Sequence, residues 1–268
     1  MNKWQMAVVG GGQMGRALVG GMLAGDVIGA ASVCVVEPSS ESRRWWQDHH
    51  PQLQVGDDLR GAITTAELVL LAVKPNVIPA VAQLESGCYD GKLVVSIAAG
   101  VSLEKLCGWI GHRRVVRVMP NTPSLVGAGA SAYCGADQVS EDDFQRIDSM
   151  LSSVGLAVRV DESQMDAVTG LSGSGPAYVC LIIEALADGG VLAGLSRPLA
   201  MKLATQTVLG TAKMIAETGQ HPGKLKDAVA SPGGTTIAAL KVLEQNGLRG
   251  ALVAAVEASA NRSKELGN

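Results

Sequence analysis

The sequence MAVVGGGQMG, residues 6–15, decides the fold of the first half of the chain. Its first four residues are an apolar run typical of a short buried strand, and glycines follow in a G-x-G-x-x-G pattern at Gly10, Gly12 and Gly15. Gly10 permits a tight turn, Gly12 lets the backbone approach a pyrophosphate, and Gly15 lets a helix pack closely on the strand. An apolar helix follows, and its N-terminus attracts phosphate charge. We therefore predict that this turn binds a dinucleotide.

The next strand, SVCVVE (32–37), ends in an acidic residue, Glu37, about twenty residues after the last glycine of the turn. A carboxylate there accepts hydrogen bonds from the ribose 2′-hydroxyl and repels a 2′-phosphate, which favours NADH. Four residues that follow are able to hold a phosphate instead: Ser39, Ser40, Arg43 and Arg44. The alternative is that both arginines are solvated helix residues. The sequence therefore predicts NADP(H) or NAD(H) as the cofactor and leaves the choice open.

Helical stretches alternate with further apolar strands, which are expected at residues 66–73, 92–98, 114–119 and 130–134. Such near-continuous apolar strands are typical of a parallel sheet that is covered on both faces. Ligands of these sheets gather at the carboxyl ends of the strands, where the sequence places Lys74, Ala99 and Asn121. We therefore expect residues 1–162 to form a Rossmann-like dinucleotide-binding domain of the α/β class.

From about residue 163 the pattern changes to helices, which are expected at residues 164–171, 176–194, 197–218, 223–230, 235–245 and 248–266. Helix 176–194 is apolar nearly all round and is broken only by Glu184 and Asp188. A helix with this composition is expected to pack against protein on all sides, and we expect a second copy of the same domain to provide that contact. We therefore predict an all-α domain at residues 163–268 that makes a tight, intertwined dimer.

The composition excludes several classes of partner. Apolar residues make up 47% of the 268 residues and the mean hydropathy is +0.23, yet no uninterrupted apolar run approaches the ~18 residues of a membrane span. The surplus apolar surface is therefore interpreted as subunit interface. A net charge of −3 and 3% aromatic residues argue against nucleic-acid binding.

The cellular compartment is predicted from the cysteines and the N-terminus. The five cysteines are scattered, form no C-x-x-C pair, and are expected to be small buried hydrophobes in a reducing compartment. The N-terminal residues MNKWQMAVVGGG lack the long apolar region of a signal peptide. These features predict a cytoplasmic protein that binds neither membranes nor nucleic acids.

The usual catalytic side chains are missing from recognisable patterns. The four histidines have no metal-ligand spacing, so no metal site is predicted, and there is no G-x-S-x-G elbow of a serine hydrolase. We interpret Arg113, Arg114 and Arg117 as the solvated edge of a strand rather than an anion site. Lys74, which ends a strand, is interpreted as a cofactor contact rather than an acid.

A second candidate anion site lies at VASPGGTTIAALKVLE, residues 229–244. A helix begins inside this segment, and Gly233 and Gly234 leave bare backbone in front of Thr235 and Thr236. A helix N-terminus offers unpaired N–H groups and partial positive charge, and threonine hydroxyls add donors, so the segment suits a small carboxylate. The alternative is a capped helix that follows a Pro-Gly turn.

Several segments together resemble the pyrroline-5-carboxylate reductase family over essentially the whole chain: VVGGGQMG, LAVKP, SIAAGVS, RVMPNTP, TGLSGSGPAYV and HPGKLKDAVASPGGTTIAALKVLE. The resemblance implies the last enzyme of proline biosynthesis, an oxidoreductase acting on a CH–NH bond. It would transfer hydride from NAD(P)H to the C=N carbon of 1-pyrroline-5-carboxylate and give L-proline. It also implies homodimers, often assembled into homodecamers, with sites built from two chains.

The resemblance also implies roles for individual residues. Thr236 would hydrogen-bond the ring nitrogen, Gly234 and Thr235 would present backbone N–H groups to the carboxylate, and Ser231 would assist Thr236 in catalysis with its hydroxyl. Glu162 matches an acidic position near the amine. The turn glycines Gly10, Gly12 and Gly15 join the family's other cofactor positions, which are Gly11, Gln13, Met14, Glu37, Ser39, Asp58, Val73, Lys74 and Ala99. The chain departs from the family at Glu37, where a small polar residue is usual, and this puts the usual NADPH preference in doubt.

The absence of a recognisable catalytic side chain agrees with this reaction, because a protonated imine accepts hydride without a strong general acid. Catalysis then consists of positioning and electrostatic stabilisation. One alternative is a β-hydroxyacid dehydrogenase-like oxidoreductase, whose catalytic Lys and Asn positions here hold Val179 and Ile182. Another is a non-catalytic nucleotide-sensing dimer, which would not need the second anion site.

Overall fold

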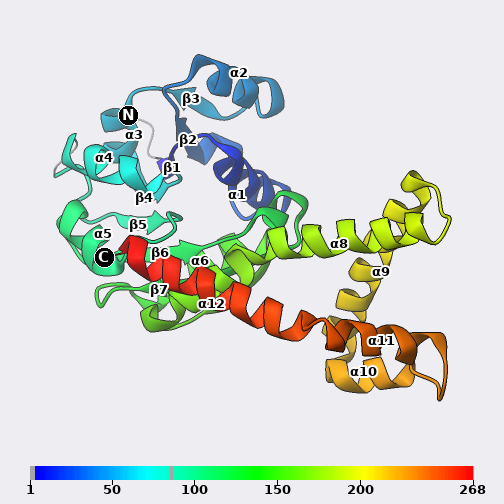
Figure 1. Cartoon of the computed structure of the whole chain (residues 1–268). Helices are drawn as coiled ribbons and strands as arrows, with labels where there is room; N and C mark the ends of the chain where they lie inside the picture. Colours follow the sequence, from blue (N-terminus) through cyan, green and yellow to red (C-terminus); the bar gives the residue numbers. More distant parts are fainter. Residues whose placement is uncertain (1–3, 85–86, 268) are drawn as a thin grey trace. The chain divides into compact units, whose positions relative to one another are not determined.

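The computed structural model describes residues 4–84 and 87–267. The chain divides into two compact units. We call Met1–Ser174 together with Ala258–Asn268 the sheet unit, and Gly175–Glu257 the helical unit. The described residues of the sheet unit contain an eight-stranded sheet, whereas those of the helical unit contain helices (Figure 1).

The sheet has the strand order β3-β2-β1-β4-β5-β6-β7-β8. Neighbouring strands are parallel from β3 to β6, β7 runs antiparallel to β6, and β8 is parallel to β7. The strands are β1 Trp4–Val9, β2 Val33–Val36, β3 Gln54–Gly56, β4 Ala66–Leu71, β5 Leu93–Ser96, β6 Val115–Met119, β7 Gly129–Gly135 and β8 Gly155–Arg159. The predicted Rossmann-like α/β domain is confirmed, but the expectation of a wholly parallel sheet is wrong at β7.

Helices cover both faces of the sheet, as buried parallel strands require. One face carries α1 (Gln13–Ala24), α2 (Ser40–His49) and α6 (Glu141–Ser152), and the other carries α3 (Leu59–Thr65), α4 (Ile78–Leu84) and α5 (Leu103–Ile110). Short helical turns complete the unit: η1 Ala30–Ser32, η2 Pro75–Val77, η3 Thr122–Val126, η4 Glu162–Gln164, α7 Met165–Val168 and the π-helical η5 Thr169–Gly173.

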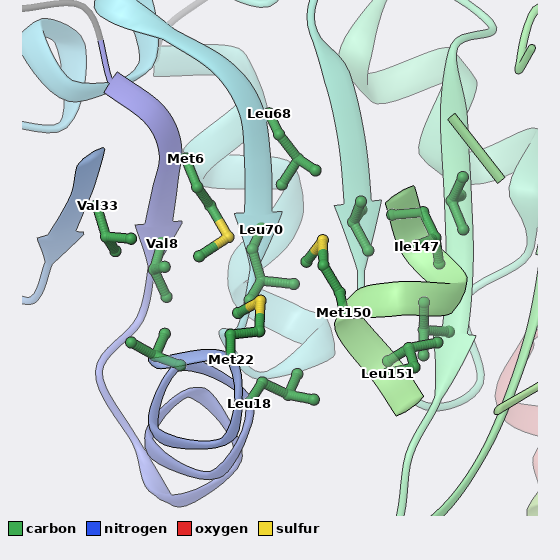
Figure 2. Packing of buried hydrophobic residues seen from close by; sticks show 14 of the residues in the cluster. Met6, Val8, Leu18, Met22, Val33, Leu68, Leu70, Ile147, Met150 and Leu151 are labelled. Carbon is green, nitrogen blue, oxygen red and sulfur yellow. The ribbon is translucent and has the colours of Figure 1, made fainter. Parts of the chain in front are cut away.

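Alternate residues of each central strand enter opposite cores, because side chains alternate along a strand. Leu68 and Leu70 of β4 pack with α1 and α6, whereas Val69 and Leu71 pack with α3, α4 and α5. Figure 2 shows Leu68 and Leu70 among side chains of β1, α1 and α6. Each fully buried side chain of this size contributes about 1.5–3 kcal/mol, so both faces of the sheet stabilise the unit.

The helical unit contains α8 (Gly175–Leu192), α9 (Arg197–Thr218), α10 (Pro222–Ala228), α11 (Thr235–Gln245) and the first part of α12 (Leu248–Gly267). Its buried cluster consists of small side chains, Ala187, Ala200 and Ala204, which join α8 to α9. Many of its large apolar side chains are exposed, including Leu181, Leu186 and Leu203. The all-α character predicted for the C-terminal part is confirmed, although the compact helical unit runs from Gly175 to Glu257. The unit leaves apolar surface that its own residues do not cover.

The stretch Glu162–Leu192 is long and apolar enough, by length and composition, to cross a membrane, because it contains an 18-residue window with a mean hydropathy of 1.4. Glu184 and Asp188 interrupt the apolar run but do not remove it from this class. This is weak evidence for a membrane span, since an apolar helix that packs against protein has the same composition.

The cysteines only partly follow the expectation of small buried hydrophobes. All five are free thiols, and Cys107 and Cys134 are buried. Burial raises the pKa of Cys134 to about 12, so it stays a neutral thiol at ordinary pH. Cys180 lies exposed on α8, so the expectation is wrong there. That helix is the one whose apolar side chains lack cover within the chain.

Candidate functional site

The turn between β1 and α1 requires glycine at its two ends and is open in the middle. Gly10 has φ +101°, and a Cβ there would lie 2.6 Å from the Ala72 carbonyl oxygen. A Cβ on Gly15 would lie 2.8 Å from the Gly10 carbonyl oxygen. A Cβ on Gly12 would meet nothing within 4 Å, so this peptide faces open space. A dinucleotide pyrophosphate fits a turn of this form, with α1 directing its N-terminus at the phosphates.

The peptide group of Gly11 is held from both sides. Its N–H donates to Glu37 Oε2 at 2.7 Å. Its carbonyl accepts from Trp46 Nε1 at 3.0 Å, from Arg16 Nε at 3.1 Å and from Ser42 Oγ at 3.1 Å. The turn is therefore fixed before any ligand arrives, which lowers the entropy cost of binding. No sequence motif pointed to Arg16, Ser42 or Trp46, because their role depends on the packing of α2 against the turn.

The remaining predicted cofactor residues follow the carboxyl ends of the parallel strands. Ser39 caps α2 and donates its N–H to Glu37 Oε1 at 2.9 Å. Asp58 caps α3 by accepting from the Gly61 N–H at 3.0 Å. Gln13 and Met14 begin α1, Val73 and Lys74 follow β4, and Ala99 follows β5. Direct contacts bring together Gly10, Gly11, Glu37, Ser39 and Val73. The strand order places the other predicted cofactor residues along the same edge of the sheet.

Asn121 is a buried residue that joins two turns near this edge. Its amide Nδ2 donates to the Ser172 carbonyl at 3.0 Å, and its Oδ1 accepts from the Ala130 N–H at 2.8 Å. These bonds tie the turn after β6 to the π-helical turn η5 and to the start of β7. The sequence placed Asn121 at a strand end, but nothing in the sequence predicts its partners.

The expectation of a solvated strand edge is wrong for Arg117. Its side chain is 7% exposed, and its guanidinium lies 3.6 Å from Glu162 Oε1 and 3.8 Å from Asp166 Oδ1. Glu162 Oε1 also accepts from the Leu103 N–H at 2.5 Å, at the start of α5. Ser263 of α12 donates to the same Asp166 oxygen at 2.7 Å. Arg117 therefore neutralises two carboxylates, one of which receives a bond from the last turns of the chain.

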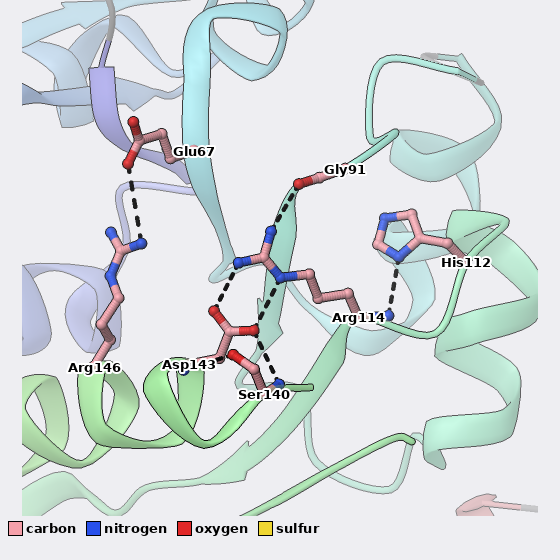
Figure 3. Close-up of polar contacts among 7 residues, drawn as sticks. All are labelled: Glu67, Gly91, His112, Arg114, Ser140, Asp143 and Arg146. Carbon is pink, nitrogen blue, oxygen red and sulfur yellow. Dashed lines mark hydrogen bonds and ion pairs between the residues drawn. The ribbon is translucent and has the colours of Figure 1, made fainter. Parts of the chain in front are cut away.

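The same expectation holds only in part for Arg114, whose side chain is 36% exposed but forms a bidentate pair with the buried Asp143 (Figure 3). The two bonds are 2.9 and 2.7 Å long, and a third guanidinium nitrogen donates to the Gly91 carbonyl at 2.8 Å. Arg114 holds the pKa of the Asp143 carboxyl below its ordinary value. Arg113 is exposed, as expected, and pairs with the exposed Asp137.

The predicted carboxylate site lies in the helical unit at the start of α11. Gly234 is the N-cap residue and offers no side chain to cap the helix. Its N–H donates to the Ser231 carbonyl at 3.0 Å, and a Cβ at Gly234 would lie 2.3 Å from Ser231 Oγ, so a larger residue would displace the Ser231 hydroxyl. Thr235 and Thr236 begin the helix, and Thr236 is half-buried. Ser231, Gly234, Thr235 and Thr236 are therefore brought together, whereas Glu162 belongs to the sheet unit.

These features define a class of protein: an oxidoreductase with a dinucleotide-binding sheet domain and a helical domain in which a helix begins without a side-chain cap. A family model described as NADP oxidoreductase, coenzyme F420-dependent, matches residues 5–100. A second model, described as pyrroline-5-carboxylate reductase dimerisation, matches residues 162–266.

Whole-chain relatives give the particular family. A pyrroline-5-carboxylate reductase of Synechocystis sp. is 47% identical over 263 residues, which cover 98% of each chain. The solved structure of a pyrroline-5-carboxylate reductase from Coxiella burnetii is 38% identical, covers 100% of both chains and has a TM-score of 0.91. That of the Plasmodium falciparum pyrroline carboxylate reductase, with NADP bound, is 33% identical with a TM-score of 0.89 over 100% of both chains.

The chain belongs to the pyrroline-5-carboxylate reductase family. The predicted family, the two-domain fold and the enzyme class are therefore confirmed. The two alternatives, a β-hydroxyacid dehydrogenase-like enzyme and a non-catalytic sensor, find no support in these relatives. The dimerisation model also bears out the prediction of a homo-oligomer.

Proposed function

We propose that this chain reduces 1-pyrroline-5-carboxylate to L-proline, with the sheet unit holding NAD(P)H and the start of α11 holding the substrate carboxylate. The observation that carries the assignment of the substrate site is the uncapped start of α11, where Ser231, Gly234, Thr235 and Thr236 gather around bare backbone. The dinucleotide phosphates have their own glycine turn in the other unit, so this second anion site is free for substrate.

The first N–H groups of a helix have no partner within the helix and carry partial positive charge. The N–H groups of Gly234 and Thr235 lie at this end of α11, and we assign the carboxylate of the substrate to them. The Gly234 N–H, which donates to the Ser231 carbonyl, would share its hydrogen between that carbonyl and the carboxylate. Gly233, with φ +68°, turns the chain so that no side chain stands in front of the helix. The charge-assisted bonds fix the position of the five-membered ring.

Thr236 is assigned to the ring nitrogen, and the Ser231 hydroxyl supports it. The bound reduced nicotinamide supplies the hydride. A protonated C=N group accepts hydride at carbon while its π electrons move to nitrogen, so no proton has to be delivered in that step. The hydroxyl of Thr236 orients the ring and stabilises the nitrogen, and the chain needs no general acid for the hydride step.

The remaining predicted residues receive roles of the same kind. The turn glycines together with Gln13 and Met14 would hold the pyrophosphate, Glu37, Ser39 and Asp58 would face the adenosine ribose, and Val73, Lys74 and Ala99 would line the nicotinamide half. Glu162 is proposed as a contact of the substrate amine. Its recorded bonds to Leu103 and Arg117 both use Oε1, so Oε2 remains available among the described residues.

The exposed apolar helices support a homodimer made through the helical unit, which would also cover the apolar stretch Glu162–Leu192. Assembly of dimers into decamers is proposed from the family resemblance. We place the enzyme in the cytoplasm, where five free thiols would stay reduced. Light scattering after size-exclusion chromatography measures the oligomer, and a mass of two or ten chains would support these assignments.

The test of the substrate site is Thr236→Ala, assayed with pyrroline-5-carboxylate and each reduced nicotinamide by the loss of nicotinamide absorbance. A hydrogen bond to a charged group contributes about 1.5–3 kcal/mol, so kcat/KM should fall about tenfold or more. Thr236→Ser keeps the hydroxyl and should restore most of this loss.

Thr211→Ala is the matched control, because Thr211 lies on α9 of the same unit and its hydroxyl donates to the Thr207 carbonyl. Its kcat/KM should stay within about twofold of wild type. Unchanged kcat and KM in Thr236→Ala would remove Thr236 from the site. Wild-type protein that oxidises neither NADH nor NADPH in the presence of substrate would refute the proposed reaction.

A further inference from the structure

We propose that Glu37 makes this chain selective for the dinucleotide that lacks a 2′-phosphate, so that NADH binds more tightly than NADPH. The inference rests on the proposed function only in that the sheet unit binds a nicotinamide dinucleotide. It sets this chain apart from the Plasmodium falciparum relative, whose solved structure has NADP bound.

The side chain of Glu37 is held in place by two backbone donors. Oε2 accepts from the Gly11 N–H at 2.7 Å, and Oε1 accepts from the Ser39 N–H at 2.9 Å. Turning the carboxylate away would leave both N–H groups without this partner, at a cost in free energy. The carboxylate therefore stays at the end of β2, beside the phosphate turn, where the adenosine ribose of a dinucleotide lies in this fold. Each oxygen keeps lone-pair capacity to accept from a ribose hydroxyl.

Arg43, which the sequence suggests as a phosphate ligand, binds other groups instead. Its Nη1 donates to the carbonyls of Glu37 and Pro38, both at 2.8 Å. The same nitrogen lies 3.6 Å from Asp57 Oδ2. These contacts hold the guanidinium on the backbone of the β2–α2 connection. Arg44, the next residue of α2, is exposed, so solvent screens its charge.

Arg16 is the other cation close to the turn, and it is also engaged. Its Nε donates to the Gly11 carbonyl at 3.1 Å and its Nη2 donates to Ser42 Oγ at 3.0 Å. Its Cζ lies 3.9 Å from the ring centroid of Trp45. Drawing this guanidinium to a 2′-phosphate would break two hydrogen bonds and the contact with the ring. Among the described residues that contact Gly11, no guanidinium is therefore free to bind a 2′-phosphate.

Further negative charge lies on the neighbouring strand connection. β3 pairs with β2 so that Val36 is opposite Gly56, and the Glu37 N–H donates to the Gly56 carbonyl at 2.9 Å. Asp57 and Asp58 follow directly on this strand. A 2′-phosphate, with a charge of about −2, would approach these carboxylates together with Glu37. Like charges placed together reject a ligand strongly, whereas a neutral ribose hydroxyl gains an acceptor.

The test measures binding apart from turnover. Dissociation constants for NADH and NADPH are obtained by calorimetric titration, and 5′-AMP and 2′,5′-ADP are compared as competitors, because this pair differs only in the 2′-phosphate. Wild type should bind NADH and 5′-AMP about tenfold or more tightly than their phosphorylated counterparts. Glu37→Gln removes the charge and keeps the shape, so both ratios should move toward the phosphorylated ligand by about tenfold or more.

Asp48→Asn is the matched control, because it removes one exposed carboxylate near the far end of α2. Its two ratios should stay within about twofold of wild type. If wild type favours NADPH, or if Glu37→Gln leaves both ratios unchanged while its melting temperature shows that it is folded, the inference fails. Failure of the proposed reaction gives a different result, since the binding ratios are measured without pyrroline-5-carboxylate.

Discussion

The two units bury similar apolar sequences in different ways. Leu70 lies in the apolar strand β4 of the sheet unit and is 1% exposed, whereas Leu181 lies in the apolar helix α8 of the helical unit and is 67% exposed. The sheet unit covers both faces of its strands with its own helices, but the buried cluster of the helical unit consists of alanines. An apolar sequence pattern therefore predicts that a segment is buried. Only the structure shows whether the residues that bury it belong to the same chain.

The difference also separates what each unit needs in order to be stable. Burial against residues of the same chain stabilises a unit at any protein concentration. Burial against a second copy stabilises it only as far as the two copies associate, which depends on concentration. The family's dimerisation model spans residues 162–266, which include the whole helical unit. We therefore expect substitutions in the helical unit to change assembly and those in the sheet core to change the free energy of unfolding.

The largest effect is expected from Leu181→Asp on the exposed face of α8. A carboxylate placed in an apolar interface loses its solvation without gaining a partner, so the oligomer should dissociate. Light scattering should report the mass of a single chain at a concentration where wild type is oligomeric. Circular dichroism should show loss of helix, because the helical unit then has little core of its own.

Leu156→Asp provides the matched control in the sheet unit. Leu156 lies on the edge strand β8 and is 63% exposed, close to the value for Leu181. Leu156 and its exposed neighbour Val158 make a small apolar area of the kind that is common on protein surfaces, so this variant should keep the mass of wild type. If both variants dissociate, or neither does, burial by a second copy does not explain the exposed apolar side chains of the helical unit.

A smaller effect, about 3 kcal/mol in the free energy of unfolding, is expected from Arg114→Leu in the sheet unit. The variant leaves the buried carboxylate of Asp143 without its cation. Arg114 lowers the pKa of Asp143, so the pair stabilises the fold above the ordinary pKa of the carboxyl, and this contribution is lost as the pH falls through the lowered value. The difference between variant and wild type should therefore be largest near neutral pH and shrink in acid.

Arg113→Leu is the control for this pair, since Arg113 and Asp137 are 51% and 67% exposed. Such surface pairs contribute about 0–1 kcal/mol, and the loss should depend little on pH. Both variants are measured by denaturant unfolding at several protein concentrations. A loss in Arg114→Leu that stays the same at acid pH would show that lost packing, and not the charge of Asp143, accounts for it.

The sequence predicts most of the sheet because the central strands are buried on both faces and read as continuous apolar runs. It misses β3 and β8, which are the two edges of the sheet. β3 has three residues, of which Gln54 is exposed, and β8 exposes Leu156 and Val158, so neither edge carries the expected pattern. The reversed direction of β7 depends on which strand it pairs with, which no local pattern encodes.

The candidate site is predictable where backbone conformation limits the residue type. The glycines of the β1–α1 turn are required by φ at Gly10 and by close approach at Gly15, so they stand out in the sequence. The groups that hold this turn do not stand out, since Trp46 reaches the Gly11 carbonyl only through the packing of α2. The roles given to Thr235 and Thr236 remain predictions, which the experiments above test.

Helix caps give the last and smallest contrast between the units. Ser102 caps α5 of the sheet unit, where its side chain accepts from the Lys105 N–H at 3.3 Å. Ser196 occupies the same position before α9 of the helical unit with a similar backbone, φ −68° and ψ 147°, but makes no side-chain cap bond. Replacing a capping serine by alanine costs about 1 kcal/mol of stability. Ser102→Ala should therefore lower the free energy of unfolding by about this amount, and Ser196→Ala should change it by less than about 0.5 kcal/mol.

Denaturant unfolding at one fixed protein concentration compares the two serine variants, because the contribution of assembly then stays constant. The pair is informative because the chemical change is the same and the backbone conformation is similar at both positions, whereas the side-chain cap bond is present at Ser102 and absent at Ser196. Equal losses would mean that Ser196 gains a cap bond in the assembled protein. In that case the start of α9 is ordered by the partner copy, and the contrast between the units would extend from side-chain packing to the helix ends.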